Sequence, residues 1–187
     1  MPITGLQDNG VPKPIYHTPA VIKNDEGKIL IFFGTGDEKN LATETYNYFY
    51  EIEDLGTSGK KNWRVDLEKG EKVLASPAVA NAVVYFTTWL YKAGGEFCGA
   101  GEGRLYGRTV TKMGAPGGEF GLVTLDPNTG KWTSPQSYMS LGAGIPSAPV
   151  VTNGMVYVST SLNANKVIQI PIPPWAVARL KSWREVF

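Results

Sequence analysis

The chain has one cysteine, Cys98, and one histidine, His17, among its 187 residues. A single cysteine excludes an internal disulfide. A zinc site or a histidine-based catalytic triad needs partner residues that this composition does not supply. We therefore expect a structural or exposed role for His17 and simple packing for Cys98. An intermolecular disulfide through Cys98 is the alternative for an exported protein.

Charge is also scarce and balanced. Charged residues make up 19% of the chain, and 18 basic against 17 acidic residues give a net charge of +1. This balance gives no electrostatic reason to expect nucleic acid binding. No stretch approaches the ~18 apolar residues of a membrane span, and the first ten residues lack the basic start and apolar run of a signal peptide. We expect either a cytosolic protein or one exported by a signal on a longer precursor.

Sustained helical periodicity is absent, and the chain instead contains a short motif that occurs three times. The motif reads TPAV at Thr18–Val21, SPAV at Ser76–Val79 and APVV at Ala148–Val151. Each copy precedes a run rich in residues that fit a pleated strand, and these runs are Ile29–Gly36, Val83–Trp89 and Met155–Ser161. Internal repetition of this kind predicts supersecondary units that bury their apolar faces against one another.

The spacing aligns the copies with one another. Pro77 to Tyr85 and Pro149 to Tyr157 are both eight positions (85−77 and 157−149), so the two tyrosines should occupy matched environments. In the first copy Phe32 holds this place, thirteen positions after its proline, which predicts a longer hairpin. We expect the inward faces to include Val79, Val84, Phe86, Val150, Val156 and Val158.

Two further strands complete each unit. The third strands are expected at Tyr48–Asp54, at Arg104–Val110 with Leu122–Asp126, and at Lys166–Ile170. Trp-led fourth strands are expected at Asn62–Leu67, Lys131–Pro135 and Ser182–Phe187. Four-stranded units of this type are the blades of a β-propeller. The sequence therefore predicts an all-β fold of about three blades over residues 16–187, after a lead-in segment at 1–15.

Few side chains are arranged for chemistry. The GAGEG run at Gly99–Gly103 has no helix after it, so it lacks the helix N-terminus that a phosphate loop needs. The carboxylates are scattered, and nothing marks a catalytic pair.

The repeat resembles the quinoprotein-like β-propeller unit, and its middle part resembles a narrower family. The run Gly70–Trp89 followed by Glu96–Gly107 is similar to the C-terminal propeller of the type IV pilus PilC/PilY family. The segment Ile31–Gly36 with Tyr48–Asp54, the segment Gly144–Val151 and the ending Ser182–Phe187 resemble further units of that propeller. The resemblance covers roughly residues 16–187.

The resemblance implies a non-enzymatic component of the type IV pilus at the cell surface, acting in pilus biogenesis or as a tip adhesin. It implies minor pilins, and a host or abiotic surface, as partners, and it implies no cofactor apart from calcium. The chain departs from the family's calcium loop, in which Asp and Asn oxygens alternate around a glycine. Its nearest match is the short turn Asn24–Gly27, and Asp37, Glu38 and Asn40 are the further candidate ligands. Calcium takes six to eight oxygens, so a solvated loop is the alternative there. It also lacks the family's long N-terminal region with its export signal.

Three blades are fewer than the four or more that close a propeller. We therefore expect the remainder of the propeller, or another protein chain, to pack against the faces of the first and last units. The alternatives from other classes are a fragment of a quinoprotein-like dehydrogenase and a bare scaffold propeller. The dehydrogenase needs calcium ligands and a stacking tryptophan around its cofactor, and the calcium ligand set is missing here.

Overall fold

The computed structural model describes residues 7–8, 11–92, 101–113, 116–124, 126, 128–162 and 168–171. Every regular element within these ranges is a β-strand, so they contain no helix that could cross a membrane. The strands form one two-stranded and three larger sheets, and all pairings are antiparallel. The all-β expectation is confirmed.

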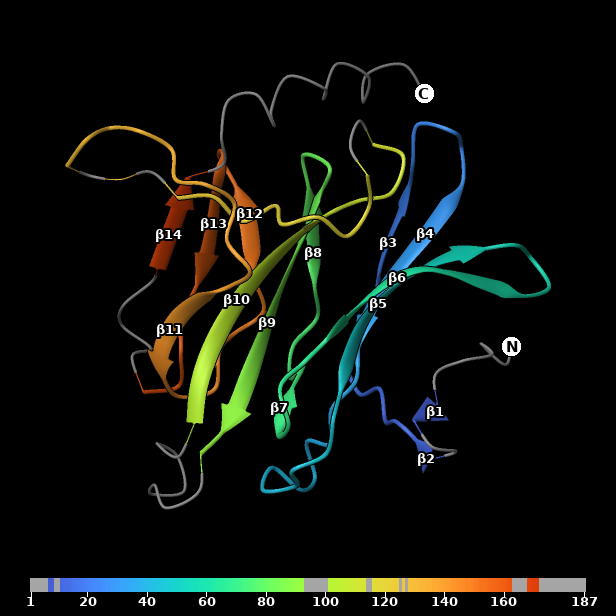
Figure 1. The fold of residues 1–187 in the computed structure, drawn as a ribbon, viewed down its shortest axis with the longest axis horizontal. Helices are drawn as coiled ribbons and strands as arrows, with labels where there is room; N and C mark the ends of the chain where they lie inside the picture. The colour runs from blue at the N-terminus through green and yellow to red at the C-terminus, as the bar shows by residue number, and fades with distance from the viewer. Residues whose placement is uncertain are drawn as a thin grey trace.

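The three larger sheets follow one another along the chain (Figure 1). The first sheet has the order β3 (Ala20–Lys23), β4 (Ile29–Gly34), β5 (Tyr48–Asp54) and β6 (Gly59–Asp66). The second sheet has the order β11 (Met139–Ala143), β10 (Gly101–Thr109) and β9 (Val83–Tyr91), and both β7 (Glu71–Lys72) and β8 (Ala78–Ala80) pair with β9. The third sheet consists of β12 (Val150–Thr152), β13 (Met155–Val158) and β14 (Ile168–Pro171).

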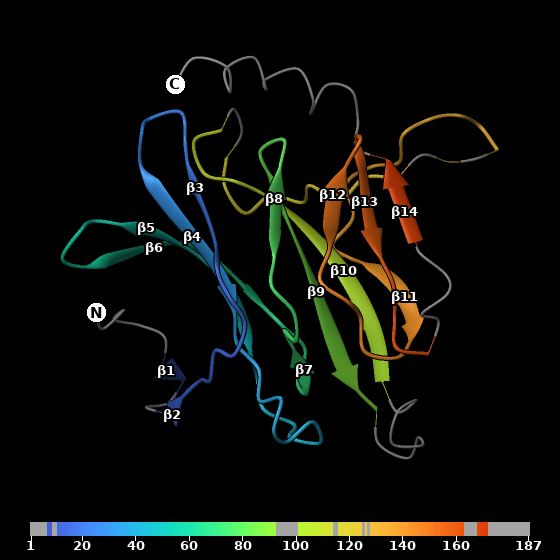
Figure 2. The same ribbon diagram turned by 180° about the vertical axis from the view of Figure 1, so that it is seen from behind.

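The repeat predicted from the sequence is a repeat of strand register. In each sheet the residue after the repeat proline lies opposite the same position of the next strand: Ala20 opposite Phe32, Ala78 opposite Tyr85 and Val150 opposite Tyr157. The first strands of the three units also lie side by side, with β8 between β3 and β12 (Figures 1 and 2). The longer hairpin of the first copy adds one cross-strand pair, Lys23 with Ile29, and a longer turn, without changing this register.

The core lies between the sheets. One cluster joins the first sheet to the second, where the rings of Phe49 and Phe86 stack at 3.7 Å with an interplanar angle of 2°. A second cluster joins the second sheet to the third through Tyr85, Leu105 and Val156. Successive strand residues point to opposite faces, so the second sheet is buried on both sides. This explains why β9 reads as a nearly continuous apolar run.

The far face of the first sheet is also apolar and largely covered. Phe33, Tyr48, Tyr50 and Ile52 form a third cluster there and are 1–7% exposed. The short strands β1 (Gln7–Asp8) and β2 (Val11–Pro12) lie on this side of the sheet (Figures 1 and 2). Val21, on β3, remains exposed. The packing of another unit against this face stays a prediction.

Four of the six predicted core valine and phenylalanine positions are buried: Val84, Phe86, Val156 and Val158. Val79 is half-buried, and Val150 is 58% exposed. Val150 was expected in the core but lies on the face of the third sheet that points away from the second, because its cross-strand partner is Tyr157 and not Val156.

The fourth strand of the second unit was predicted in the wrong place. The edge strand is β11 at Met139–Ala143, whereas the predicted strand Lys131–Pro135 lies outside the named strands. The third strand ends at Thr109, and Leu122 makes only an isolated bridge to Gln136. The chain leaves the sheet between β10 and β11, so Trp132 does not match Trp63 on β6. The remaining Trp-led segment, Ser182–Phe187, lies outside the described residues.

Candidate functional site

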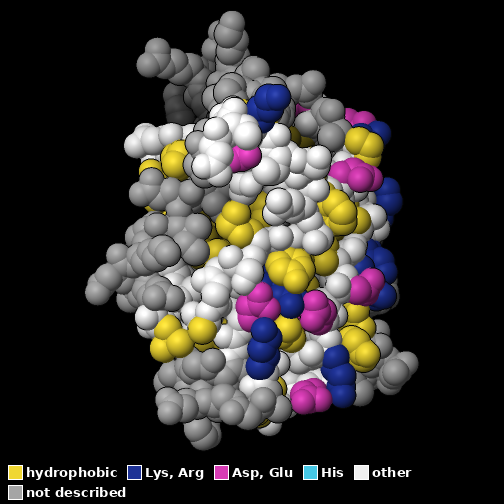
Figure 3. Space-filling view, turned by 60° about the vertical axis from the view of Figure 1, so that its left-hand side comes forward, with side chains coloured by type: hydrophobic (Ala, Val, Ile, Leu, Met, Phe, Trp, Pro, Cys, Tyr) yellow, Lys and Arg dark blue, Asp and Glu magenta, His cyan; other side chains and the backbone are white. Residues whose placement is uncertain are grey.

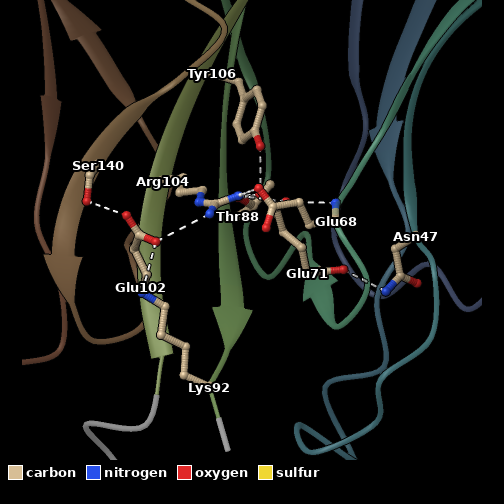
Figure 4. A network of polar contacts seen from close by, with 9 residues as sticks. All are labelled: Asn47, Glu68, Glu71, Thr88, Lys92, Glu102, Arg104, Tyr106 and Ser140. Atoms are coloured by element: carbon tan, nitrogen blue, oxygen red, sulfur yellow. Dashed lines mark hydrogen bonds and ion pairs between the residues drawn. The ribbon is translucent and has the colours of Figure 1, made fainter.

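A charged network lies where β7 meets β9 and β10 (Figure 4). Gly70, with a φ of +86°, turns the chain into β7, and the N–H of Glu71 closes this turn by donating to the carbonyl of Glu68. Antiparallel pairing then places Arg104 of β10 opposite Thr88 of β9. The turn at Gly70 and the register of β9 with β10 thus bring Glu71 and Arg104 together, although they are 33 positions apart in the chain.

Glu71 is the centre of this network and is fully buried. Its Oε1 accepts hydrogen bonds from the hydroxyl groups of Thr88 and Tyr106, the latter at 2.8 Å. Its Oε2 accepts from the backbone N–H of Glu68 at 3.0 Å and from Nη1 of Arg104 at 3.2 Å. A buried carboxylate is stable only when paired and hydrogen-bonded, and both oxygens of Glu71 meet this requirement.

Arg104 connects three carboxylates. Its guanidinium lies 2.8 Å from Glu68, 3.2 Å from Glu71 and 3.3 Å from Glu102, and its charge also stacks 4.3 Å from the ring centre of Tyr138. Burial disfavours the charged form, but the Glu68 hydrogen bond and the Glu71 charge outweigh it and raise the pKa of Arg104 above its ordinary value.

Tyr106 and Glu102 respond to the same network in opposite directions. Burial, together with the neighbouring Glu71 charge, raises the pKa of Tyr106 and keeps its hydroxyl a hydrogen-bond donor. A hydrogen bond from Ser140 lowers the pKa of Glu102; burial opposes this shift, and the Arg104 charge adds to it. The arrangement is one of fixed charges in which both oxygens of Glu71 are hydrogen-bonded, while Nε of Arg104 is buried without a hydrogen-bond partner. It is suited to holding β7 and its turn against β9 and β10.

A shallow pocket opens beside this network. Its lining residues are Lys92, Gly101, Glu102, Ser140, Gly142 and Ala143. Lys92 lies 3.3 Å from Glu102, so the one ammonium group at the rim is already paired. The pocket therefore offers a small polar surface next to the buried ion pair.

A second buried charge, Lys72, lies one residue after Glu71. Its ammonium donates to the carbonyl oxygens of Thr43 at 2.6 Å and Gly70 at 3.0 Å. Burial lowers the pKa of Lys72, against the raising effect of the Asp37 and Glu44 charges. Lys72 thus anchors the loop after β4 to the turn that precedes β7.

The segments that contain these residues belong to the family resemblance found in the sequence, but the network itself was not predicted. A signal was present, because Glu71 and Arg104 are charged residues within apolar strand runs, and such residues are rarely buried unless paired. The pairing depends on the register between β9 and β10, which the repeat does not specify. The GAGEG run was not expected to form a phosphate loop. Its residues Gly101 and Gly103 lie in β10, and a Cβ on Gly101 would come within 2.2 Å of the Trp89 indole.

The predicted calcium ligands lie on the exposed loop after β4. Oδ1 of Asp37 accepts hydrogen bonds from the backbone N–H groups of Lys39 at 3.0 Å and Asn40 at 3.3 Å, and Glu38 lies 3.3 Å from His17. Across the described part of the chain, no three His, Cys, Asp or Glu side chains lie close enough together to hold a metal ion. Weak calcium binding here stays a prediction, which a calcium-dependent rise in melting temperature that is lost in Asp37→Ala would test.

Other residues considered from the sequence have structural surroundings. Glu51 is buried between the first two sheets and accepts from Asn62 at 2.8 Å and from the N–H of Thr111 at 3.0 Å. In the aromatic run at 46–50, Tyr48 and Tyr50 pack on the far face of the first sheet, Phe49 packs against the second sheet, and Tyr46 is exposed. Cys98 lies outside the described residues.

No protein-family model matches the sequence, and no curated protein matches it. Among solved structures, the chain is similar to the C-terminal domain of PilY1 from Pseudomonas aeruginosa, with a TM-score of 0.59 at 13% sequence identity. The match covers 92% of this chain and 47% of that chain, so this chain spans about half the length of the domain that it matches. The resemblance found in the sequence is thus confirmed at the level of the fold, which this chain shares with the PilY1 C-terminal domain.

Proposed function

We propose that this chain is a non-enzymatic component of the type IV pilus system, acting in pilus biogenesis or as a tip adhesin. The observation that carries the proposal is the agreement of two separate findings. The sequence motifs resemble the propeller of the pilus-associated PilC/PilY family, and the fold matches the PilY1 C-terminal domain over 92% of this chain. Pilus association implies that the protein acts outside the cell.

In this proposal the three larger sheets are three blades of a larger β-propeller. The shared register of the first two strands in each sheet supports this assignment, as does the position of β8 between β3 and β12. The blades would occupy residues 16–187, after a lead-in at 1–15. Because the chain matches about half of the neighbour, further blades would complete the ring.

The proposed mechanism is recognition of partner proteins by the loops and edges of this rigid scaffold, since loops on a stable β-framework commonly carry binding. Figure 3 shows a face on which acidic and basic side chains lie interspersed among hydrophobic ones. A surface of mixed sign favours a protein partner over a polyanion. Minor pilins are the partners that the family resemblance implies, followed by a host or abiotic surface.

The same proposal predicts no enzymatic activity. In support, the buried carboxylates Glu71 and Glu51 are fully engaged in structural hydrogen bonds, so neither is poised as a general base. Incubating the protein with calcium and pyrroloquinoline quinone, followed by absorbance spectroscopy, tests the dehydrogenase alternative. A bound chromophore in stoichiometric amount would contradict the proposal.

The binding role is tested directly by measuring association between the purified chain and the minor pilins of the organism that encodes it. We expect saturable binding in biolayer interferometry, with no binding to the major pilin as the matched control. A Val84→Asp variant, in which an unpaired charge in the core is expected to unfold the chain, should lose this binding together with its folded structure. Equal binding to all pilins, or to none, would contradict the proposal.

A further inference from the structure

The two interfaces inside this chain repeat one packing rule. Phe32 of the first sheet is fully buried against the second sheet, in the cluster that contains Val84 and packs against Val79. Tyr85, at the matching position of the second sheet, is 3% exposed and packs in the cluster that contains Val156 and borders Val151. The aromatic residue of each unit therefore points towards the cross-strand pair of valines in the following unit.

The third sheet has the same aromatic position, and no further sheet follows it among the described residues. Tyr157 lies opposite Val150 in the register that Tyr85 makes with Ala78. Directly opposed residues share one face of a sheet, and Val156 on the other face packs towards the second sheet. Val150 is 58% exposed and Tyr157 only half-buried, so this face is apolar and uncovered at the point where the first two sheets are covered.

The first sheet has a cross-strand pair that no preceding sheet covers among the described residues. Val21 lies opposite Ile31, in the register of Val79 with Val84 and of Val151 with Val156. Val21 is 59% exposed and Ile31 is partly buried, although Phe33 and Tyr50 on the same face are covered. The open part of this face is therefore the pair Val21 and Ile31. The matching pairs of the second and third sheets pack against an aromatic residue of the preceding unit.

We infer that a second copy of this chain docks head to tail, with Val150 and Tyr157 of one copy against Val21 and Ile31 of the other. This inference rests on the proposed propeller fold and names its partner. Every copy carries both faces, so in a two-fold dimer each face contacts the other face of the partner, and the two equivalent contacts close the ring. Two copies would span 94% of the length of the structural neighbour, twice the 47% that one copy covers.

The test is the mass of the full chain in solution, measured by sedimentation over a wide concentration range. We expect the mass of a dimer, and at least a tenfold weaker association for both Val150→Asp and Val21→Asp. Leu55→Asp is the matched control, because Leu55 is 49% exposed, lies between β5 and β6, and belongs to neither proposed contact pair. Circular dichroism checks that all three variants keep the native fold.

Three results would overturn the inference. The first is a wild-type chain that stays monomeric at every concentration, and the second is a Val150→Asp variant that associates as well as Leu55→Asp. The third is a dimer that is weakened by Val150→Asp but not by Val21→Asp, which would indicate pairing between two third sheets. A monomer that still binds minor pilins would overturn this inference and leave the proposed function standing.

Discussion

Arg104 of β10 and Glu71 of β7 form a buried ion pair, with Nη1 of the arginine 3.2 Å from Oε2 of the glutamate. The side chains are 5% and 0% exposed, so removing either partner leaves the other as an uncompensated buried charge. Such a loss costs about 3–5 kcal/mol of unfolding free energy. We predict this loss for Arg104→Met in urea unfolding measurements.

The matched control is Lys69→Met. Lys69 lies 3.1 Å from Glu44, but both side chains are more than half exposed. An exposed pair of this kind contributes about 0–1 kcal/mol. Equal losses for Arg104→Met and Lys69→Met would contradict the view that the buried network stabilises the contact between β7 and its sheet.

The core assignment predicts opposite results for two valines. Val84 is fully buried between the first and second sheets, so Val84→Asp places an unpaired charge in an apolar environment. The cost of several kcal/mol approaches the entire stability of a typical domain, about 5–15 kcal/mol. We expect Val84→Asp to be unfolded by circular dichroism and Val150→Asp to remain folded. A folded Val84→Asp protein would contradict the inter-sheet core.

The turn between β8 and β9 is strained at Ala82. Asn81 and Ala82 have φ values of +52° and +63°, and Asn153 and Gly154 adopt the same left-handed pair in the third unit with +50° and +71°. A non-glycine residue in this region costs roughly 1–2 kcal/mol. Ala82→Gly should therefore raise the unfolding free energy by about 1 kcal/mol, whereas Ala80→Gly, within β8, should lower it by about 0.5–1 kcal/mol. A loss of stability in Ala82→Gly would contradict the observed turn.

Stability at alkaline pH should depend on Tyr85. Burial raises the pKa of Tyr85 to about 12, against 10.0 for an ordinary tyrosine. The folded state therefore keeps a proton that the unfolded state loses, so stability is fully present below pH 10 and falls as pH rises towards 12, by about 1.4 kcal/mol per pH unit from this group. Tyr85→Phe should reduce this slope and Tyr46→Phe, at an exposed tyrosine, should not. Equal slopes in both variants would contradict the prediction.

The sequence predicted those parts of the fold that local signals determine. The repeat prolines aligned Tyr85 with Tyr157, and the two tyrosines lie at the same register position of their sheets, opposite Ala78 and Val150. The third strand of the first unit, Tyr48–Asp54, has the predicted bounds. These features depend on alternation of apolar residues and on turn chemistry, and both are visible in a short window.

The sequence failed where distant segments decide the outcome. Trp132 sits in a strand-like run, yet the edge of the second sheet is taken by Met139–Ala143, because the chain makes a long excursion after β10. The partnership of Glu71 with Arg104 depends on β7 and β10 both pairing with β9. Val150 was predicted in the core because the repeat does not reveal which sheets have a neighbour on both sides. Among the described residues, no further sheet follows the third one.

The most direct test of the account is deletion of the gene in its own organism, followed by counting surface pili by electron microscopy. A role in pilus biogenesis or at the pilus tip predicts loss of surface pili, or of pilus-dependent attachment. Complementation with the wild-type chain, supplied in its natural sequence context, should restore the lost property, and the unfolded Val84→Asp variant should not. Normal pilus number together with normal attachment in the deletion strain would contradict the central claim.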